Sequence, residues 1–557
     1  AALTASAAPE AVAAVAALVA LVPEVGVARV RPLFETLVRD RKSHPLVAAQ
    51  AANFLALWAA DAGDDAAAAA IWRGLGLIDT AAVCGPFEAT GRGGIDQVNP
   101  PEQPKGGPAP GRRFAGKLRE VGWREMAGPT INGALALDGL LRPDKDAAAY
   151  VLLYVRSSRA QPAVLRLGSP GPLKVWSGGA PVLRNEAVRE ARLDQDAAPV
   201  RLAVGENAIL IKTVVLSGAW RLYARFTDAD GRPLTGIAVK AVGRAALSTS
   251  GRAGPPRPPL ELGTRLRSRA EAAKAGQPQA AAWLDYARWL ALSRQSDRDG
   301  KQEEAILERA ADGAPADAAG RTVAADALLL LGQRAIEPND RREAFDRALT
   351  VAPDAGRKAE ALVGLAELAR AQRREREAVL RFREALTADP ENLDAVLAFA
   401  SEEESAGLPA AALARLDALK PPQRNRDRVE LARARLLEAQ GRRRESEAIQ
   451  NAVFAHRRTD LEIALALARR ARDRGDLARA IALHDEGARR RPDLTFLATE
   501  AARMREGQGD LAGARAGLEA LTVRLPDEAS LWEELGRFLI RRDDLAGGSA
   551  NLRKALA

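Results

Sequence analysis

The sequence predicts a multidomain α and β protein with helices at both ends and a β-sandwich between them. Three observations support this prediction: apolar residues at helical spacing near the start, short broken apolar runs in the middle, and a 34-residue period in the C-terminal half. A chain of 557 residues is also too long for one hydrophobic core. We expect an N-terminal helical block, a β-sandwich, a Pro/Gly-rich linker and an α-solenoid at 1–79, 80–243, 244–263 and 264–557.

The N-terminal block is expected to be helical and to pack against the sandwich. Its apolar residues lie near helical spacing and would form a core seam: Phe54, Leu57, Trp58, Ile71 and Trp72. The apolar run at 11–22 is shorter than the roughly 20 residues that a membrane-spanning helix needs. It also lacks a basic start, so we interpret it as a core helix and not as part of a signal peptide.

The middle region changes to short apolar or alternating runs that Gly, Pro, Asn and Asp interrupt. The runs lie at 149–155, 163–167, 173–176, 200–204, 208–215 and 221–226. Short strands with turn signals about every 8–12 residues are typical of a β-sandwich. The Pro-rich stretch that follows is expected to be a stiff connector.

The C-terminal half repeats at a fixed step, which predicts stacked helix hairpins. Glycines keep this step at Gly407, Gly441, Gly475 and Gly509. Two columns of small residues keep it as well: Ala366, Ala400, Ala434, Ala468, Ala502 and Gly536, and Ala378, Ala412, Ser446, Ala480, Ala514 and Gly548. Only small side chains let two crossing helices approach closely, and each hairpin needs a neighbour to bury its apolar face.

These repeats resemble the tetratricopeptide family. One unit matches the family pattern at Leu362, Leu365, Ala366, Ala378, Phe382, Ala385 and Pro390, and the last unit matches at Trp532, Leu535, Gly536, Leu539, Leu552 and Ala555. The resemblance implies a superhelix whose concave face, rich in Arg and Glu, suits a polar or acidic peptide or protein partner.

The middle region resembles galactose-binding-like jelly-roll modules. The residues that carry this resemblance are 165–168 (LRLG), 173–176 (LKVW) and 179–182 (GAPV). Together with 84–87 (CGPF) and 100–102 (PPE), they are similar to envelope proteins of myxobacterial type, which join such a module to tetratricopeptide repeats and often to a transglutaminase-like domain. The resemblance implies a bacterial cell envelope location, periplasmic or on the outer surface, with the cytoplasm as the alternative.

The candidate ligand-binding residues lie in the sandwich. Trp123, Trp176 and Trp220 would stack on a sugar ring, although such residues more often fill a core. Asn185, Asp194 and Asp196 would supply polar ligands to a sugar or calcium, although loop acids more often only face solvent.

Other chemistry finds little support in the sequence. One cysteine, Cys84, and three scattered histidines form no catalytic, cofactor-binding or metal-binding motif. The net charge of +9 is the small remainder of 82 basic and 73 acidic residues. Arginine clusters such as 489–491 have acids nearby, and we interpret them as solvated helix faces and not as a nucleic-acid surface.

The sequence therefore favours a non-catalytic scaffold or adaptor that binds a protein or peptide partner through the solenoid, with the sandwich as a second surface. The alternatives are a glycan-binding envelope protein and a positioning arm for an enzyme whose catalytic domain follows residue 557. No cofactor is expected for this chain.

Overall fold

The computed structural model describes residues 7–103, 107–109, 111–127, 130–243, 261–294 and 301–556. The predicted linker at 244–263 lies mostly outside these residues. The chain divides into unit 1, which comprises 1–52 and 261–456, and unit 2, which comprises 53–260 and 457–557. Both units combine distant parts of the sequence. The boundaries of the four predicted domains stay a prediction.

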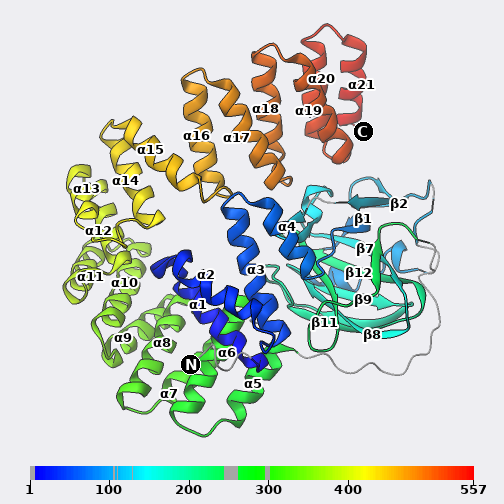
Figure 1. The fold of residues 1–557 in the computed structure, drawn as a ribbon. Coiled ribbons are helices and arrows are strands. Elements are labelled where there is room, and N and C mark those ends of the chain that lie inside the picture. Colours follow the sequence, from blue (N-terminus) through cyan, green and yellow to red (C-terminus); the bar gives the residue numbers. More distant parts are fainter. Residues whose placement is uncertain are drawn as a thin grey trace. The chain divides into compact units, whose positions relative to one another are not determined.

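Unit 2 contains two large antiparallel sheets and one small two-stranded sheet (Figure 1). The larger sheet has the order β10-β9-β12-β7-β1-β4, with β14 also paired to β7. Its strands are β1 (Thr80–Glu88), β4 (Trp123–Ala127), β7 (Ala147–Ser157), β9 (Leu173–Ser177), β10 (Ala180–Asn185), β12 (Gly205–Val215) and β14 (Ile237–Lys240).

The smaller sheet has the order β11-β8-β13-β6-β5. Its strands are β5 (Thr130–Ile131), β6 (Ala134–Ala136), β8 (Gln161–Gly168), β11 (Asp196–Leu202) and β13 (Arg221–Thr227). A separate two-stranded sheet joins β2 (Phe114–Ala115) to β3 (Glu120–Val121), and short 3-10 turns form η3 (Arg92–Ile95), η4 (Pro100–Glu102) and η5 (Leu137–Gly139).

The two larger sheets share one hydrophobic core. Val151 and Leu153 of β7 point into it and meet Leu165 of β8 and Phe226 of β13. Alternate residues of the same strand, including Tyr150, point to the opposite face and form a second apolar layer. The predicted antiparallel sandwich region is thus confirmed, and its long strands are apolar on both faces.

Unit 2 also contains helices from both ends of its sequence. They are α4 (Asp65–Gly74), α16 (Leu461–Asp473), α17 (Leu477–Arg490), α18 (Thr495–Gly507), α19 (Leu511–Arg524), α20 (Ala529–Ile540) and α21 (Leu545–Leu556). Helix α3 (Pro45–Asp61) belongs to unit 1 up to residue 52 and to unit 2 from residue 53.

Unit 1 is helical throughout its described residues. It begins with η2 (Pro9–Ala11), α1 (Val12–Val25) and α2 (Val27–Arg39). It continues with α5 (Leu262–Ala272), α6 (Gln277–Ser293), α7 (Lys301–Asp312), α8 (Ala318–Arg334), α9 (Pro338–Val351), α10 (Ala355–Ala371), α11 (Glu375–Ala388), α12 (Leu393–Ser405), α13 (Pro409–Asp417), α14 (Asp427–Ala439) and α15 (Arg443–Phe454).

The predicted hairpin repeat is confirmed in both units. The glycines that recur once per repeat lie shortly after the first helix of a hairpin and have φ between 76° and 85°, a conformation that glycine adopts without strain. Residues of the two small-residue columns are buried between helices, for example Ala366, Ala412 and Ala468. A Cβ added at Gly536 would come within 3.1 Å of the Gly548 carbonyl oxygen, which shows how closely these helices cross.

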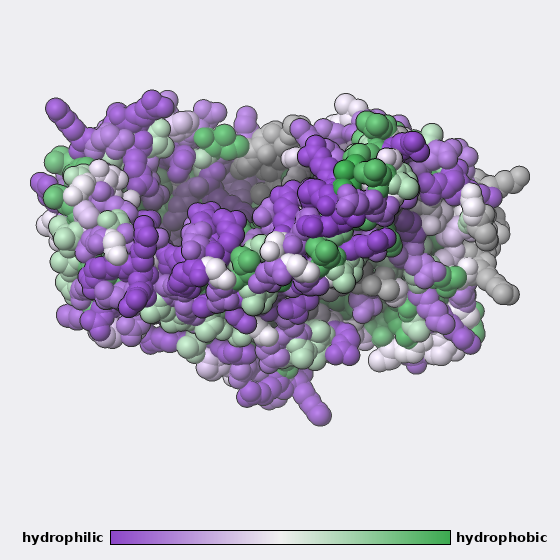
Figure 2. All heavy atoms as spheres, turned by 90° about the horizontal axis from the view of Figure 1, so that it is seen from above, coloured by the Kyte–Doolittle hydropathy of each residue, from purple (hydrophilic) through white to green (hydrophobic). Residues whose placement is uncertain are grey.

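The face of the molecule that Figure 2 shows is mainly polar. On the face in Figure 2, hydrophilic residues prevail and apolar residues form small separate patches. Among the described residues, every helix is too short or too polar to cross a membrane.

Candidate binding pocket

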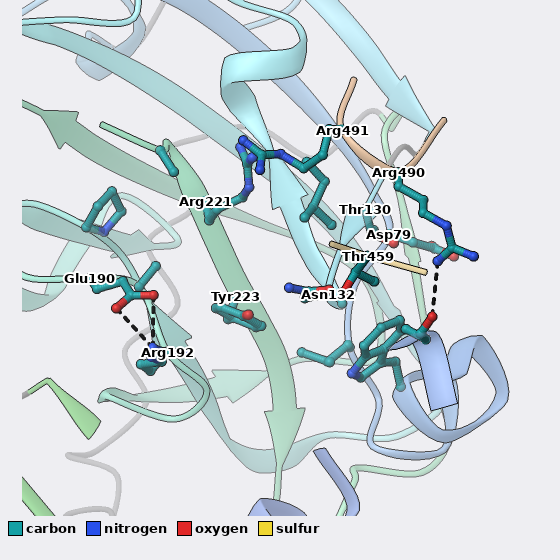
Figure 3. Close-up of a pocket in the computed structure, with 18 of the residues that line it drawn as sticks. Asp79, Thr130, Asn132, Glu190, Arg192, Arg221, Tyr223, Thr459, Arg490 and Arg491 are labelled. Atoms are coloured by element: carbon teal, nitrogen blue, oxygen red, sulfur yellow. Dashed lines mark hydrogen bonds and ion pairs between the residues drawn. The ribbon is translucent and has the colours of Figure 1, made fainter. Parts of the chain in front are cut away.

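Unit 2 contains a pocket of about 840 Å³ that is lined by residues from several separate parts of its sequence. The walls come from α3 and α4, from the β5–β6 hairpin and strand β13, from the loop at 186–195, and from the end of α17 (Figure 3). Seven arginines line it: Arg73, Arg189, Arg192, Arg221, Arg489, Arg490 and Arg491.

The turn of the β5–β6 hairpin forms one wall. Asn132 and Gly133 have φ of 54° and 81°, which suits a tight two-residue hairpin turn. Gly133 also packs so closely that an added Cβ would lie 2.9 Å from the Trp72 ring. The Trp72 indole donates to Asn53 Oδ1 at 3.1 Å, so the hairpin rests on an anchored aromatic ring.

The loop at 186–195 is fixed by a buried acid, Asp196. Its carboxylate accepts hydrogen bonds from the Asn185 amide and from the Arg189 guanidinium. The backbone N–H of Arg189 donates to the Pro170 carbonyl at 2.8 Å. Burial raises the pKa of Asp196, although Arg189 and Asn185 oppose the shift.

A second buried pair fixes the end of the same loop. Arg225 donates from Nε and Nη2 to the two carboxylate oxygens of Asp194 at 2.8 and 2.5 Å. Burial acts to raise the pKa of Asp194, but the charge and hydrogen bonds of Arg225 outweigh it, so the pKa lies below its ordinary value. Arg225 also donates to the Leu75 carbonyl at 3.2 Å, which ties the loop to the segment after α4.

The end of α17 is joined to the sandwich through Asp493. Its carboxylate accepts from Arg491 Nε and Nη2 at 3.0 and 2.8 Å and lies 3.2 Å from Arg221 Nη2. Arg221 also pairs with Asp138, and Arg142 Nη2 donates to the Asp493 carbonyl at 2.9 Å. Burial acts to raise the pKa of Asp493, but Arg491 and Arg221 lower it below its ordinary value, so Asp493 stays ionised at neutral pH.

A further pair joins the same end of α17 to α4. Arg490 Nη1 and Nη2 donate to the two Asp65 oxygens at 2.8 and 3.0 Å, and Figure 3 shows this contact at the pocket edge. The Arg490 guanidinium also donates to the Ala60 carbonyl at 3.2 Å. Arg490 and Arg491 therefore have fixed positions at the end of α17.

Tyr223 lies at the centre of the view in Figure 3, between Arg192 and Asn132. Burial raises the pKa of its hydroxyl, and the charges of Arg192 and Arg221 act in the opposite direction. The hydroxyl is therefore protonated at neutral pH and is available as a hydrogen-bond donor in a site whose other groups are mainly guanidinium donors.

The charge balance of the lining favours an anionic ligand. The carboxylates that line the pocket belong to Asp65, Asp79 and Glu190. Asp138, Asp196 and Asp493 lie behind the lining and pair with Arg221, Arg189 and Arg491.

Two arginines of the pocket are not neutralised by any acid that the structure describes. Arg73 and Arg489 form no ion pair with any described residue. Guanidinium groups present planar, forked donors that match a carboxylate or a phosphate.

The six residues predicted from the sequence lie in three places. Asn185, Asp194 and Asp196 come together at the anchored loop, where each has a protein partner. Trp220 is fully buried in the shared core, and its indole donates to Thr213 Oγ1 at 3.2 Å. Trp220 therefore fills the core of the sandwich in this structure.

Trp123 and Trp176 pack against the outer apolar layer of the larger sheet. Trp123 is on β4 and Trp176 is on β9, so β12, β7 and β1 lie between them and the two rings do not form one stacking surface. Ligand binding by any of the six residues stays a prediction.

The sequence interpretation missed the pocket arginines. It assigned 489–491 to a solvated helix face, whereas the Arg490 side chain is only 14% exposed and lines the pocket. The useful signal would have been three consecutive arginines at the end of a helix, directly before Pro492 and Asp493. In the described part of the chain, no group of three or more His, Cys, Asp or Glu residues could hold a metal ion.

No protein-family model matches the chain, and no curated protein matches its sequence significantly. Among solved structures, a tetratricopeptide repeat protein from Parabacteroides merdae is similar at 17% identity, with 42% of this chain and 91% of that chain covered and a TM-score of 0.28. PilF of Pseudomonas aeruginosa is similar at 18% identity, with 40% and 99% covered and a TM-score of 0.31.

Yeast Tom70 is similar at 12% identity, with 53% of this chain and 60% of that chain covered and a TM-score of 0.29. Because all three TM-scores lie below 0.5, the likeness carries no argument about function.

Proposed function

We propose that this chain is a non-catalytic scaffold that binds a protein partner through its helix hairpins and its sandwich, and that the pocket of unit 2 holds an acidic segment of that partner. The observation that carries the proposal is the arginine-lined pocket to which the sandwich and the end of α17 both contribute. It is a binding site with fixed cationic donors. Its titratable groups are arginines, three acids and Tyr223, and the proposal assigns no catalytic role to any of them.

The size and rigidity of the pocket support this proposal. A volume of about 840 Å³ lies within the range of ligand sites and accommodates a few side chains of an extended segment. Buried pairs such as Arg225–Asp194 and Arg189–Asp196 hold the walls in place before a ligand arrives. Preorganised donors lose less conformational entropy on binding, so a short acidic segment gains affinity.

The test uses a fluorescein-labelled peptide of alternating Glu and Gly, titrated into the full chain and followed by fluorescence anisotropy. A peptide with Gln in place of Glu serves as the ligand control. We expect saturable binding of the Glu peptide that weakens as salt is added, because exposed charges are screened. The arginine side chains do not titrate near neutral pH, so the affinity is expected to be constant from about pH 6 to 9.

Arg73→Gln and Arg489→Gln are the informative variants, since neither change leaves an internal acid without its partner. Each is expected to raise the Kd about 10-fold, which corresponds to ~1.4 kcal/mol. Arg553→Gln on α21 makes the same change of charge at an exposed position and is the matched control. Equal affinity of all three variants for the peptide would refute the pocket as the site.

Three earlier alternatives stay predictions: glycan binding by the sandwich, a bacterial envelope location, and a role as the positioning arm of an enzyme domain that follows. Retention of the chain on a polysaccharide gel, lost with Trp176→Ala, would support the first of them. If the chain binds the Glu peptide but is retained on no sugar, the proposed scaffold function is favoured over glycan binding.

A further inference from the structure

The N-terminal helix α1 belongs to unit 1 and packs against the first complete hairpin of that unit. It contacts α6, and the preceding turn η2 contacts α5. The face that it buries is formed by Val12, Ala13, Val15 and Ala16, all nearly inaccessible to solvent. A segment from the beginning of the chain is thus docked on helices that come much later in the sequence, after the whole sandwich.

Helix α6 is buried on more than one side. Its buried residues include large aromatic side chains and small residues around the helix: Ala280, Ala282, Trp283, Leu284, Tyr286, Ala287, Trp289, Leu290 and Ser293. A helix with buried residues on several sides needs a neighbouring element on each of those sides. Helices α5, α7 and α8 supply some of them, and α1 supplies another.

The first helices of the hairpins face the inner side of unit 1. Helices α6, α8, α10, α12 and α14 contact one another in sequence, more extensively than the second helices of the hairpins do. Helices crowd on the inside of a curved stack and spread on the outside, so the side that α1 occupies is the inner one. Figure 1 shows dark blue α1 and α2 inside the arc of the green and yellow helices of this unit.

The far end of α1 reaches a later hairpin of the same unit. Gly26, between α1 and α2, has φ of 80°, and the Cζ of Arg426 lies 3.3 Å from where its Cβ would be. Arg426 is the N-cap residue of α14. The N-terminal segment therefore extends from α6 to the start of α14 along the inner side.

We propose that the segment 9–39 is an intramolecular ligand of the inner face of unit 1 and that it blocks this face against a partner helix. A partner that binds there has to present a helix of the same chemistry, with Val and Ala on one face and no charge on that face, and has to displace α1. The inference rests on the proposed scaffold role but not on the pocket, which lies in unit 2, so the two tests fail independently.

The exposed loop between α2 and α3 makes the proposal testable in the full chain. Asp40, Arg41 and Lys42 are exposed there, so a recognition site for a specific protease can be inserted between Asp40 and Ser43. Cleavage converts the intramolecular ligand into a separate fragment. While the segment is tethered, its effective concentration is about 1 mM. After cleavage, this value falls to the concentration of the fragment in the solution.

The readouts are gel filtration of the cleaved protein on dilution, circular dichroism of the remainder, and anisotropy of a labelled synthetic peptide of residues 9–39. We expect the fragment to dissociate, the remainder to keep its helicity, and the peptide to bind the remainder but not the uncleaved chain. Val15→Asp in the peptide is expected to weaken binding by about 100-fold because it places a charge in the buried face. Leu21→Asp, at a position that is 45% exposed, is the matched control and is expected to change the affinity less than about 3-fold.

Two outcomes would overturn the proposal. If the fragment leaves only together with a loss of helicity in the remainder, α1 is an integral part of unit 1 and not a ligand. If the uncleaved chain binds the peptide as tightly as the cleaved remainder does, the inner face is not blocked.

Discussion

The sandwich and the helix hairpins use the same chemical pair, arginine with a carboxylate, in two different ways. In the sandwich, Arg225 and Asp194 are 0% and 1% exposed and fix a loop. In the hairpins, Arg503 and Glu534 connect helices of neighbouring repeats, but Arg503 is 52% exposed. Breaking a buried pair leaves a charge that water cannot solvate, whereas breaking an exposed pair costs little.

This difference indicates where the rigidity of the molecule comes from. The pocket depends on buried pairs such as Arg225–Asp194 and Arg189–Asp196, and few substitutions will be tolerated there. The hairpins depend instead on small buried residues and on local turns, and their surface pairs only supplement the packing.

Replacing Arg225 by Met is expected to have the largest effect, a loss of about 3–5 kcal/mol in the free energy of unfolding of the sandwich. The reason is the Asp194 carboxylate, which is left buried without its partner. Urea unfolding followed by tryptophan fluorescence measures the change. The double variant Arg225→Met/Asp194→Leu is expected to recover most of the loss, and no recovery would show that Arg225 acts through packing alone.

Acid is expected to weaken the same pair. The pKa of Asp194 in the folded chain lies below its ordinary value, so the pair contributes stability above the unfolded pKa of about 3.9 and loses it as the pH falls through the lower folded value. The urea midpoint of the sandwich should therefore fall below about pH 4. Arg225→Met/Asp194→Leu should be less sensitive to acid in this range, and equal sensitivity would argue against the pair.

In the hairpins, neighbouring alanines of α13 provide a matched test of packing. Ala412 is fully buried in a small-residue column and Ala411 is exposed. Ala412→Leu is expected to lower the free energy of unfolding by about 1–3 kcal/mol, because the closely packed helices have no room for the larger side chain. Leu at position 411 is expected to change stability by at most about 0.5 kcal/mol. Similar losses at both positions would contradict the role of the column.

The smallest effect is expected for Arg503→Gln. Exposed pairs typically contribute about 0.2–1 kcal/mol, and salt reduces this further. A double-mutant cycle with Glu534→Gln measures the coupling energy directly. A coupling as large as the loss expected for Arg225→Met would mean that the hairpins depend on their surface pairs as strongly as the sandwich depends on its buried ones.

The hairpins were predictable from the sequence because each contact recurs at a fixed step. The position of a residue within the repeat is enough to predict its structural role, as for Gly441 in the turn and for Ala468 between packed helices. The sandwich was predictable as a class of fold, since its strands are short apolar runs between turn residues.

The pocket was not predictable in the same way. Asp194 and Asp196 suggested ligand contacts, but the arginines that pair with them, Arg225 and Arg189, are identified only once the strands are placed. Arg490 and its partner Asp65 are far apart in the sequence, whereas Arg189 and Asp196 are close in sequence but meet only in the folded loop. No local period encodes such contacts, so this site required the three-dimensional structure.

Hydrogen–deuterium exchange of the full chain with and without the Glu peptide shows directly which segments the peptide contacts. We expect slower exchange on binding in two segments, the loop at 186–195 and the end of α17 through Asp493. The Gln peptide should leave both segments unchanged. Protection confined to other helices, or no protection with the Glu peptide at saturation, would contradict the assignment of the arginine-lined pocket as the binding site.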